Sequence, residues 1–374
     1  MNKGFHIQDI ILFPLSLLFG IIVWMRNRLF DLNFLRSKEF EIPVISVGNI
    51  SVGGTGKTPH VEYIIRLLKD ESRLAMLSRG YKRKTTGYVL ADTNSTSDDI
   101  GDEPRQVKQK FPYISVAVDG NRVRGITKLL ETEKGLEAII LDDAFQHRYV
   151  TAGMSVLLVD YSYPLKNDFY LPYGRLREPA SERARADVII VTKCPARIKP
   201  IDRRLMEKDL IMFAYQKIFF TTFLYGEPIP VFENFAIETS LEKIKNINPS
   251  VMLLTGIANP VPLKKFVNSF SSNIEELIYP DHYTYNASDL HELIVKFTSI
   301  SQKEKIVITT EKDAMRLQHF SDLDEEIKAA IYYIPVHIEF LENESKDFNH
   351  IITSYVRNNK PDNILHRPKD KKQA

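Results

Sequence analysis

Short apolar, β-branched runs alternate with helical segments along the chain from residue 42 onwards. We predict strands at residues 42–48, 73–79, 114–118, 137–143, 154–160 and 187–193. This alternation is typical of βαβ units, which place their strands in a mostly parallel sheet with helices on both faces. The pattern therefore predicts an α/β domain over residues 37–215.

A second, smaller α/β domain is predicted over residues 236–330. Its strands are expected at 251–256, in the run IEELIYP and at 305–310, and its helices near 260–270 and 288–300. The linker, residues 216–235, has two β-rich runs around a Tyr-Gly-Glu turn, which favours a β-hairpin. Residues 331–374 are expected to hold a strand that returns to this hairpin at 331–340, a C-terminal helix and a basic tail.

Residues 92–104, DTNSTSDDIGDEP, interrupt the first domain with an acidic stretch of loop composition. Loops of this length inside a compact domain usually carry function. We therefore expect a functional loop at this place.

The N-terminus has a different texture, because Ile10 to Met25 is a run of sixteen uncharged residues followed by Arg26 and Arg28. A bilayer-spanning helix needs about 20 apolar residues, so this run is marginal as a full span. Basic residues among the apolar ones that follow favour a helix that lies at the membrane surface. We predict a membrane-associated helix within residues 1–36. The alternatives are a secretory signal, for which no small-residue cleavage site follows, and a buried helix of a soluble core.

Composition narrows the function classes further. The chain has 374 residues, 44% hydrophobic and 26% charged, with a net charge of +2. This balance is that of a globular protein and gives no reason to expect nucleic-acid binding. A single cysteine, Cys194, excludes an intramolecular disulfide and fits a reducing compartment. No obligatory protein partner is evident.

The stretch ISVGNISVGGTGKTPH, residues 45–60, connects a predicted strand to a predicted helix. Glycine backbone N–H groups and a helix N-terminus converge there on an anion, with Lys57 reaching the outer phosphates and the Thr58 hydroxyl placed for Mg²⁺. The loop is a variant, since Ser51 stands where the usual pattern has its first glycine. It predicts nucleotide binding and a P-loop NTPase-like fold. The predicted phosphate-binding residues are Ser51, Val52, Gly53, Gly54, Thr55, Gly56, Lys57 and Thr58.

A second acidic element, EAIILDD, ends an apolar strand in Asp142 and Asp143. P-loop enzymes hold Mg²⁺ through such a residue, and we assign Asp142 to the metal. Gln146 and His147 follow in DDAFQHR and are either phosphate contacts or structural residues. The loop alone does not choose between ATPase, GTPase and kinase, although Pro195 in VTKCP disfavours guanine specificity.

Phosphoryl transfer to an alcohol needs a carboxylate that takes the hydroxyl proton. Asp102 and Glu103 in IGDEPRQ offer such a pair, although the same residues would also suit the first turn of a helix. Positive charge for the migrating group is available from Arg122 and Arg124 and from the segment YGRLREP.

Seven segments in order, VGNISVGGTGKTP, LSRGYKRK, GDEP, LDDAFQHR, LREP, VTKCP and DHY, resemble the tetraacyldisaccharide 4'-kinase family. They span residues 44–283. The resemblance implies transfer of the ATP γ-phosphate, with Mg²⁺, to the 4'-hydroxyl of an acylated glucosamine disaccharide 1-phosphate in lipid A biosynthesis. It also implies work at the cytoplasmic face of the bacterial inner membrane. The alternative is a membrane-attached P-loop ATPase or GTPase switch.

The same resemblance implies roles for individual residues. Asp102 matches a general base, Glu103 a metal-binding or water-positioning group, and His282 a partner of Asp102. Further residues match motif positions and are expected near the nucleotide: Tyr81, Arg122, Gln146, His147, Arg177 and Glu178.

Overall fold

The computed structural model describes residues 7–166, 168–235, 239–281, 283–318, 320 and 323–360. The chain divides into two compact units. The first consists of residues 1–95, 107–223 and 338–374, and the second of residues 96–106 and 224–337. The chain therefore passes between the units four times.

The first unit is built on a sheet that has nine strands within the described residues, in the order β14-β8-β7-β6-β1-β5-β2-β4-β3. Strands β8 through β4 pair in parallel, and β3 pairs antiparallel to β4 at the edge. The strand bounds are β1 Val44–Gly48, β2 Leu74–Ser78, β3 Val89–Leu90, β4 Ser115–Val118, β5 Ala138–Asp142, β6 Met154–Asp160, β7 Val188–Thr192, β8 Lys217–Tyr225 and β14 Val336–Phe340.

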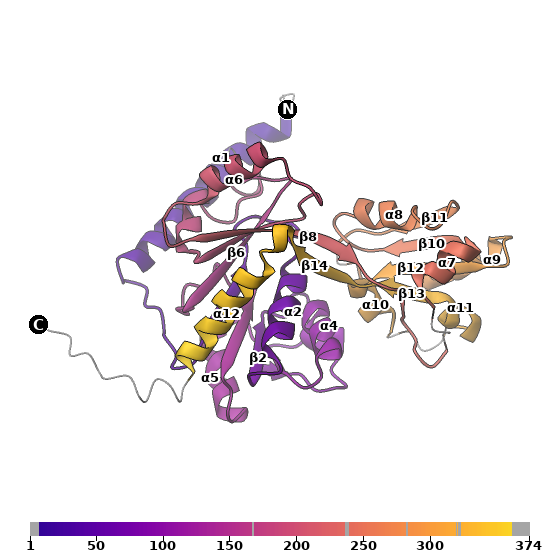
Figure 1. The fold of residues 1–374 in the computed structure, drawn as a ribbon, viewed down its shortest axis with the longest axis horizontal. Coiled ribbons are helices and arrows are strands. Elements are labelled where there is room, and N and C mark those ends of the chain that lie inside the picture. Colours follow the sequence, from indigo (N-terminus) through magenta and orange to yellow (C-terminus); the bar gives the residue numbers. More distant parts are fainter. Residues whose placement is uncertain are drawn as a thin grey trace, which may run out of the picture. The chain divides into compact units, whose positions relative to one another are not determined.

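Helices cover this sheet. Every residue of β1, β2, β5 and β7 is buried, as expected for parallel strands covered on both faces. The helix bounds are α1 Ile7–Asp31, α2 Lys57–Leu68, α5 Arg122–Thr132, α6 Pro200–Leu210 and α12 Ser345–Asn359, with 3₁₀ turns at Ala180–Arg185 and Leu341–Asn343. Helix α4, Asp102–Lys110, begins in the second unit and ends in the first. Helix α12 lies beside α2 (Figure 1). Between these two helices the Tyr63 hydroxyl donates to Asn349 at 2.9 Å.

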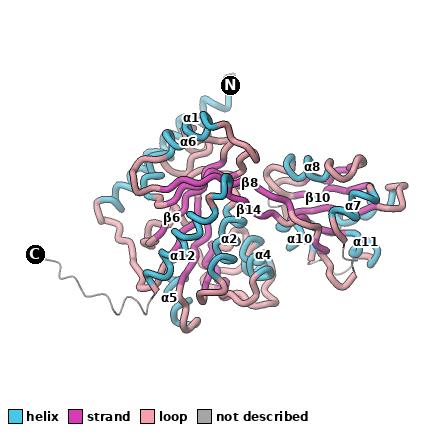
Figure 2. The backbone as a smooth tube through the Cα atoms, viewed as in Figure 1, coloured by secondary structure: helices cyan, strands magenta, loops and turns pink. Residues whose placement is uncertain are grey.

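The second unit has its own sheet, with five strands within the described residues, in the order β11-β10-β12-β13-β9. All of its strand pairs are parallel except that of β9 with β13. Figure 2 distinguishes the helices, strands and loops of each unit by colour. The bounds are β9 Ile229–Pro230, β10 Ser250–Thr255, β11 Ile274–Ile278, β12 Lys305–Thr310 and β13 Ile331–Ile334, with helices α3 Ser97–Ile100, α7 Leu241–Ile247, α8 Val261–Val267, α9 Ala287–Ser299, α10 Glu311–Leu317 and α11 Glu325–Ala330.

Three local predictions were wrong. The runs at 217–225 and 229–230 do not form a hairpin, because β8 pairs with β7 and β9 pairs with β13 of the other sheet. The run at 331–340 is two strands, β13 and β14, in different sheets; Pro335 lies between them, where its missing N–H suits a break in the ladder. The strand β14 does return to β8, as expected.

The third correction concerns residues 92–104. The structure places helix α3 at Ser97–Ile100 and begins α4 at Asp102, so the second half of this stretch is helical and only residues 92–96 form a loop. A capping box explains α3: the Thr96 side chain accepts from the Asp99 N–H, and the Asp99 carboxylate accepts from the Thr96 N–H. The predicted basic tail lies outside the described residues.

Candidate active site

The predicted phosphate-binding loop lies between β1 and α2, where the sequence placed it. Gly56 precedes the helix with a left-handed backbone at φ +83°, and Gly53 has φ +110°. A Cβ atom on Gly56 would lie 2.4 Å from the Phe223 ring, and one on Gly53 would lie 2.5 Å from the Arg175 guanidinium. Both positions therefore require glycine. A Cβ at Gly54 would meet no atom within 4 Å, so the loop is open there.

Residues 175–177 run alongside the loop and are hydrogen-bonded to its backbone. The Val52 N–H donates to the Arg175 carbonyl at 2.7 Å, and the Arg177 N–H donates to the Ile50 carbonyl at 2.8 Å. The Arg175 guanidinium donates to the Val52 carbonyl at 3.1 Å and stacks on the Tyr163 ring at 3.6 Å. The predicted basic segment YGRLREP is thus fixed against the loop.

Lys57, Asp143 and Arg177 form a charged group at the start of α2. The Lys57 ammonium lies 3.5 Å from the Asp143 carboxylate, which Arg177 contacts at 3.2 and 3.3 Å. Burial by itself would raise the pKa of Asp143, but Lys57 and Arg177 outweigh it and lower the pKa below its ordinary value. Two cations held by one carboxylate at a helix N-terminus leave net positive charge there, which suits a phosphate.

Asp142 occupies the end of β5, next to β1, and only 2% of it is exposed. Its carboxylate accepts from the Ser78 hydroxyl at 3.1 Å, and its carbonyl accepts from the buried Arg122 guanidinium at 3.2 Å. Burial lowers the pKa of Arg122 to about 10, and Asp142 and Asp143 oppose that shift, so Arg122 stays cationic at neutral pH. The buried Arg122 guanidinium therefore offsets the negative charge of Asp142 and Asp143.

The oxygen donors at this place are of the kind that bind Mg²⁺. Mg²⁺ takes oxygen ligands and usually binds to one or two protein groups together with phosphate oxygens and water. The Thr58 hydroxyl, in the first turn of α2, and the Asp142 carboxylate are such groups. Within the described residues no group of three or more His, Cys, Asp or Glu side chains gathers, as an all-protein cage would require.

Gln146 and His147 lie in the segment after β5. The Gln146 amide donates to the Asn49 carbonyl at 2.7 Å, so it supports the loop's backbone directly. Burial, together with the charges of Arg122, Arg79 and Arg26, lowers the pKa of His147 to about 4. His147 is therefore neutral at pH 7. Contact of either residue with phosphate stays a prediction.

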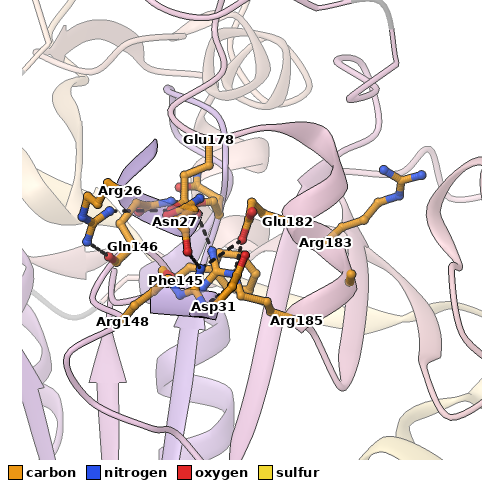
Figure 3. Close-up of polar contacts among 12 residues, drawn as sticks. Arg26, Asn27, Asp31, Phe145, Gln146, Arg148, Glu178, Glu182, Arg183 and Arg185 are labelled. Carbon is orange, nitrogen blue, oxygen red and sulfur yellow. Dashed lines mark hydrogen bonds and ion pairs between the residues drawn. The ribbon is translucent and has the colours of Figure 1, made fainter. Parts of the chain in front are cut away.

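Tyr81 and Glu178 have different surroundings from the residues above. Tyr81 is exposed, next to Gly80. Glu178 is fully buried and forms ion pairs with Arg185, at 2.5 Å, and with Arg26 of α1, at 3.9 Å (Figure 3). Burial raises the pKa of Glu178 above its ordinary value, although Arg185 and Arg26 oppose this shift. The carboxylate of Glu178 thus belongs to a cluster with α1.

Asp102 and Glu103 open helix α4 and belong to the second unit. The Arg316 guanidinium of α10 donates to one Asp102 oxygen through Nε at 3.0 Å and Nη2 at 2.5 Å. The Lys312 ammonium, one turn earlier on α10, pairs with Glu103 at 2.5 Å. Arg316 is itself held by the buried Asp313 at 2.8 Å. An arginine beside a carboxylate stabilises its ionised form, which is the form that accepts a proton. His282 lies outside the described residues.

Sequence reasoning missed several residues of these networks, namely Asn49, Lys312 and Arg316. Asn49 lies inside the quoted loop stretch, so its position in the sequence was the available signal. Arg316 and Lys312 lie more than 200 positions from their partners. No local pattern predicts such a pairing.

Comparison with known proteins places the chain. The family model Tetraacyldisaccharide-1-P 4'-kinase matches residues 8–357. The chain belongs to the tetraacyldisaccharide 4'-kinase family. Proteins named tetraacyldisaccharide 4'-kinase are similar to it: that of Bacteroides thetaiotaomicron is 46% identical over 354 residues, covering 93% of each chain, and that of Flavobacterium johnsoniae is 42% identical, covering 93% of this chain and 97% of the relative.

A solved structure agrees with this family assignment. The crystal structure of an "apo" form of LpxK from Aquifex aeolicus in complex with ATP is 30% identical, covers 92% of this chain and 98% of its own, and has a TM-score of 0.71. The predicted family, the enzyme class and the fold class, a mostly parallel α/β sheet, are confirmed.

Proposed function

We propose that this chain transfers the γ-phosphate of ATP to the 4'-hydroxyl of an acylated glucosamine disaccharide 1-phosphate, a lipid A precursor. The observation that carries the proposal is the charged group of Lys57, Arg177 and Asp143 at the uncapped N-terminus of α2, in a chain of this family. Such a site binds a polyphosphate and stabilises the charge of a migrating phosphoryl group.

Lys57 and the backbone of residues 51–58 hold the phosphates, and Arg177 adds charge next to Lys57. In this structure the Asp143 carboxylate, 3.5 Å away, is the negative partner of the Lys57 ammonium. A phosphate oxygen that pairs with Lys57 takes over part of this ion pairing. Thr58 and Asp142 are the proposed Mg²⁺ ligands; the ion would neutralise phosphate charge. The other proposed nucleotide-site residues are Tyr81, Arg122, Gln146, His147 and Glu178.

Asp102 takes the proton of the acceptor hydroxyl, and His282 assists it. Arg316 contacts a single oxygen of Asp102 through two N–H groups, which fixes the orientation of the carboxylate. Glu103, the third proposed metal-binding group, is ion-paired with Lys312 at 2.5 Å. Its carboxylate can therefore bind a metal only if Lys312 moves away or if the carboxylate contacts Lys312 and the metal together.

A lipid acceptor is supported by helix α1. Its buried positions are Ser16, Gly20, Val23, Asn27 and Phe30, spaced alternately four and three residues apart, so one narrow stripe faces the protein. Two of the five side chains are polar, whereas apolar side chains point outward: Ile10, Ile11, Phe13, Leu15, Leu17, Leu18, Ile21, Ile22, Trp24 and Met25 are exposed. The pattern is the reverse of that of a soluble surface helix.

Residues 10–31 are also long and apolar enough to cross a membrane, by length and composition. We propose that α1 binds the cytoplasmic face of the bacterial inner membrane, where the acylated acceptor presents its sugar. An exposed apolar surface of this size is otherwise unfavourable in water.

The test is ATP turnover with and without the acylated disaccharide 1-phosphate in detergent micelles. We expect the product to carry the γ-phosphate, with little ATP hydrolysis in the absence of acceptor. Lys57→Ala, which removes the phosphate-binding charge, is the matched negative control. Hydrolysis at the same rate without acceptor, and no labelled lipid, would instead indicate a membrane-attached ATPase switch.

A further inference from the structure

Helix α1 is tied to the segment that follows β5 by its one partly buried arginine. The Arg26 guanidinium donates through Nη2 to the Gln146 carbonyl at 2.6 Å, while its Nη1 lies 3.9 Å from the Glu178 carboxylate (Figure 3). Arg148 strengthens the same joint, donating to the Asn27 carbonyl at 3.1 Å and to Asp31 at 2.7 Å. A helix that served only as an anchor would not need a charged side chain in contact with the segment after β5.

Gln146 continues this contact to the phosphate-binding loop. Its side-chain amide donates to the Asn49 carbonyl at 2.7 Å, and the Asn49 amide donates to the Thr55 hydroxyl at 2.9 Å. Asn49 is fully buried and 2% of Thr55 is exposed. These contacts bridge the start of the loop to the residue just before Gly56, so the position of Gln146 sets the shape of the loop.

A second branch runs through Glu178, which is fully buried. Its neighbour in the chain, Arg177, donates its N–H to the Ile50 carbonyl and its guanidinium to Asp143, the partner of Lys57. The two N–H groups of Arg26 thus point at both branches, one to Gln146 and one to Glu178. Only a forked cation serves two such acceptors at once.

We propose that Arg26 is a positioning residue for the phosphate-binding loop. The membrane-associated helix thereby supports the ATP site through Gln146 and Glu178, without contacting ATP itself. The inference rests on the proposed function in that the loop is taken to bind ATP. It adds that ATP affinity depends on a residue of the membrane helix that touches neither phosphate nor acceptor.

The experiment compares Arg26→Ala with Arg28→Ala in the full chain. Arg28 lies two residues away on the same helix, carries the same charge, is exposed, and contacts only the Trp24 ring among the interactions described for it, at 5.8 Å. The ATP dissociation constant is measured by titration calorimetry in detergent without acceptor. Binding to vesicles of phosphatidylethanolamine and phosphatidylglycerol is measured by flotation.

We expect Arg26→Ala to weaken ATP binding about tenfold, the size expected for losing a hydrogen bond from a charged donor. Arg28→Ala should stay within about twofold. Vesicle flotation should be the same for both variants, and in turnover assays the KM for ATP should rise more than kcat falls. Arg26→Lys should restore part of the affinity, because an ammonium can serve Gln146 or Glu178.

The same affinity for ATP in Arg26→Ala and wild type would overturn the proposal, as would equal losses in the two alanine variants. If Arg26→Ala does not fold, Arg26→Met, which keeps the apolar stem of the side chain but has no N–H donor, is measured in its place and the same outcomes decide. Because binding is measured without acceptor, a protein that binds ATP but transfers no phosphate would contradict the proposed function and leave this inference standing.

Discussion

Lowering the pH from 7 to 5 should loosen helix α2 through protonation of His60. This residue lies in the first turn of α2 and is 1% exposed. Its Nδ1 lies 2.7 Å from the Gly56 carbonyl and its Nε2 lies 3.1 Å from the Thr221 hydroxyl. The carbonyl can only accept, so Nδ1 carries the proton and Nε2 accepts from Thr221. Protonation of Nε2 would put a positive charge on the buried His60 ring and remove the acceptor for the Thr221 hydroxyl.

Burial lowers the pKa of His60 from its ordinary 6.5 to about 4, although the bond to the Gly56 carbonyl opposes the shift. Between these two values the unfolded chain binds more protons than the folded one. Stability is therefore highest above pH 6.5 and falls as the pH drops towards 4. Over the interval from pH 7 to pH 5 this single group accounts for about 2 kcal/mol of the free energy of opening.

Hydrogen exchange of the α2 amides, corrected for intrinsic rates, measures this free energy in the region concerned. We expect protection to fall about 30-fold between pH 7 and pH 5. In His60→Gln, which cannot titrate, protection should be lower at pH 7 but nearly independent of pH over the same interval. A wild-type protein whose α2 protection does not change with pH would refute this account of His60, and so would an equal fall in both proteins.

Three further perturbations test other parts of the site. Gly56→Ala should weaken ATP binding more than tenfold, because a left-handed alanine costs about 1–2 kcal/mol before any clash. Gly120→Ala, at a glycine outside the loop where a Cβ would meet no atom within 4 Å, is the calorimetric control. Lys57→Ala should reduce turnover about 1000-fold, measured as labelled lipid formed, since it removes charge at the migrating phosphoryl group. Arg316→Ala should lower kcat about 100-fold by releasing Asp102, while the ATP dissociation constant stays unchanged. Arg316→Lys should recover part of kcat. Full activity in Arg316→Ala would contradict the positioning role of Arg316.

The parts of the fold that sequence predicted well are those set by local pattern. The expected strand at 154–160 is β6 with the same bounds, and the expected strand at 305–310 is β12. The strand, glycine loop and helix around Lys57 were also predictable, because left-handed glycines and an uncapped helix N-terminus have a strong sequence signature.

The errors arose where pairing partners decide the structure. The composition of residues 92–104 is that of a loop, yet the Thr96 capping box and the first turn at Asp102 make helices there. Strands β8 and β9 are close in sequence but belong to different sheets, which a turn signal between them cannot reveal. Hydrophobic pattern shows that a run is extended and does not show which strand it pairs with.

The candidate site divides in the same way. Asp142, Lys57 and Arg177 were predicted as site residues from motifs, and the structure brings Lys57 and Arg177 together on Asp143. The contacts of Arg26 with Gln146 and of Arg316 with Asp102 join residues 120 and 214 positions apart. Such contacts depend on tertiary packing, and no spacing rule for helices or strands contains them.

The proposed division of labour between Lys57 and Asp102 is tested most directly by single-turnover transfer from γ-labelled ATP to the acylated disaccharide 1-phosphate, with Asp102→Asn compared to wild type. We expect transfer to slow by about 100-fold or more, the usual contribution of a general base, while the ATP dissociation constant stays within about twofold. Transfer at the wild-type rate in Asp102→Asn would contradict the role given to this carboxylate.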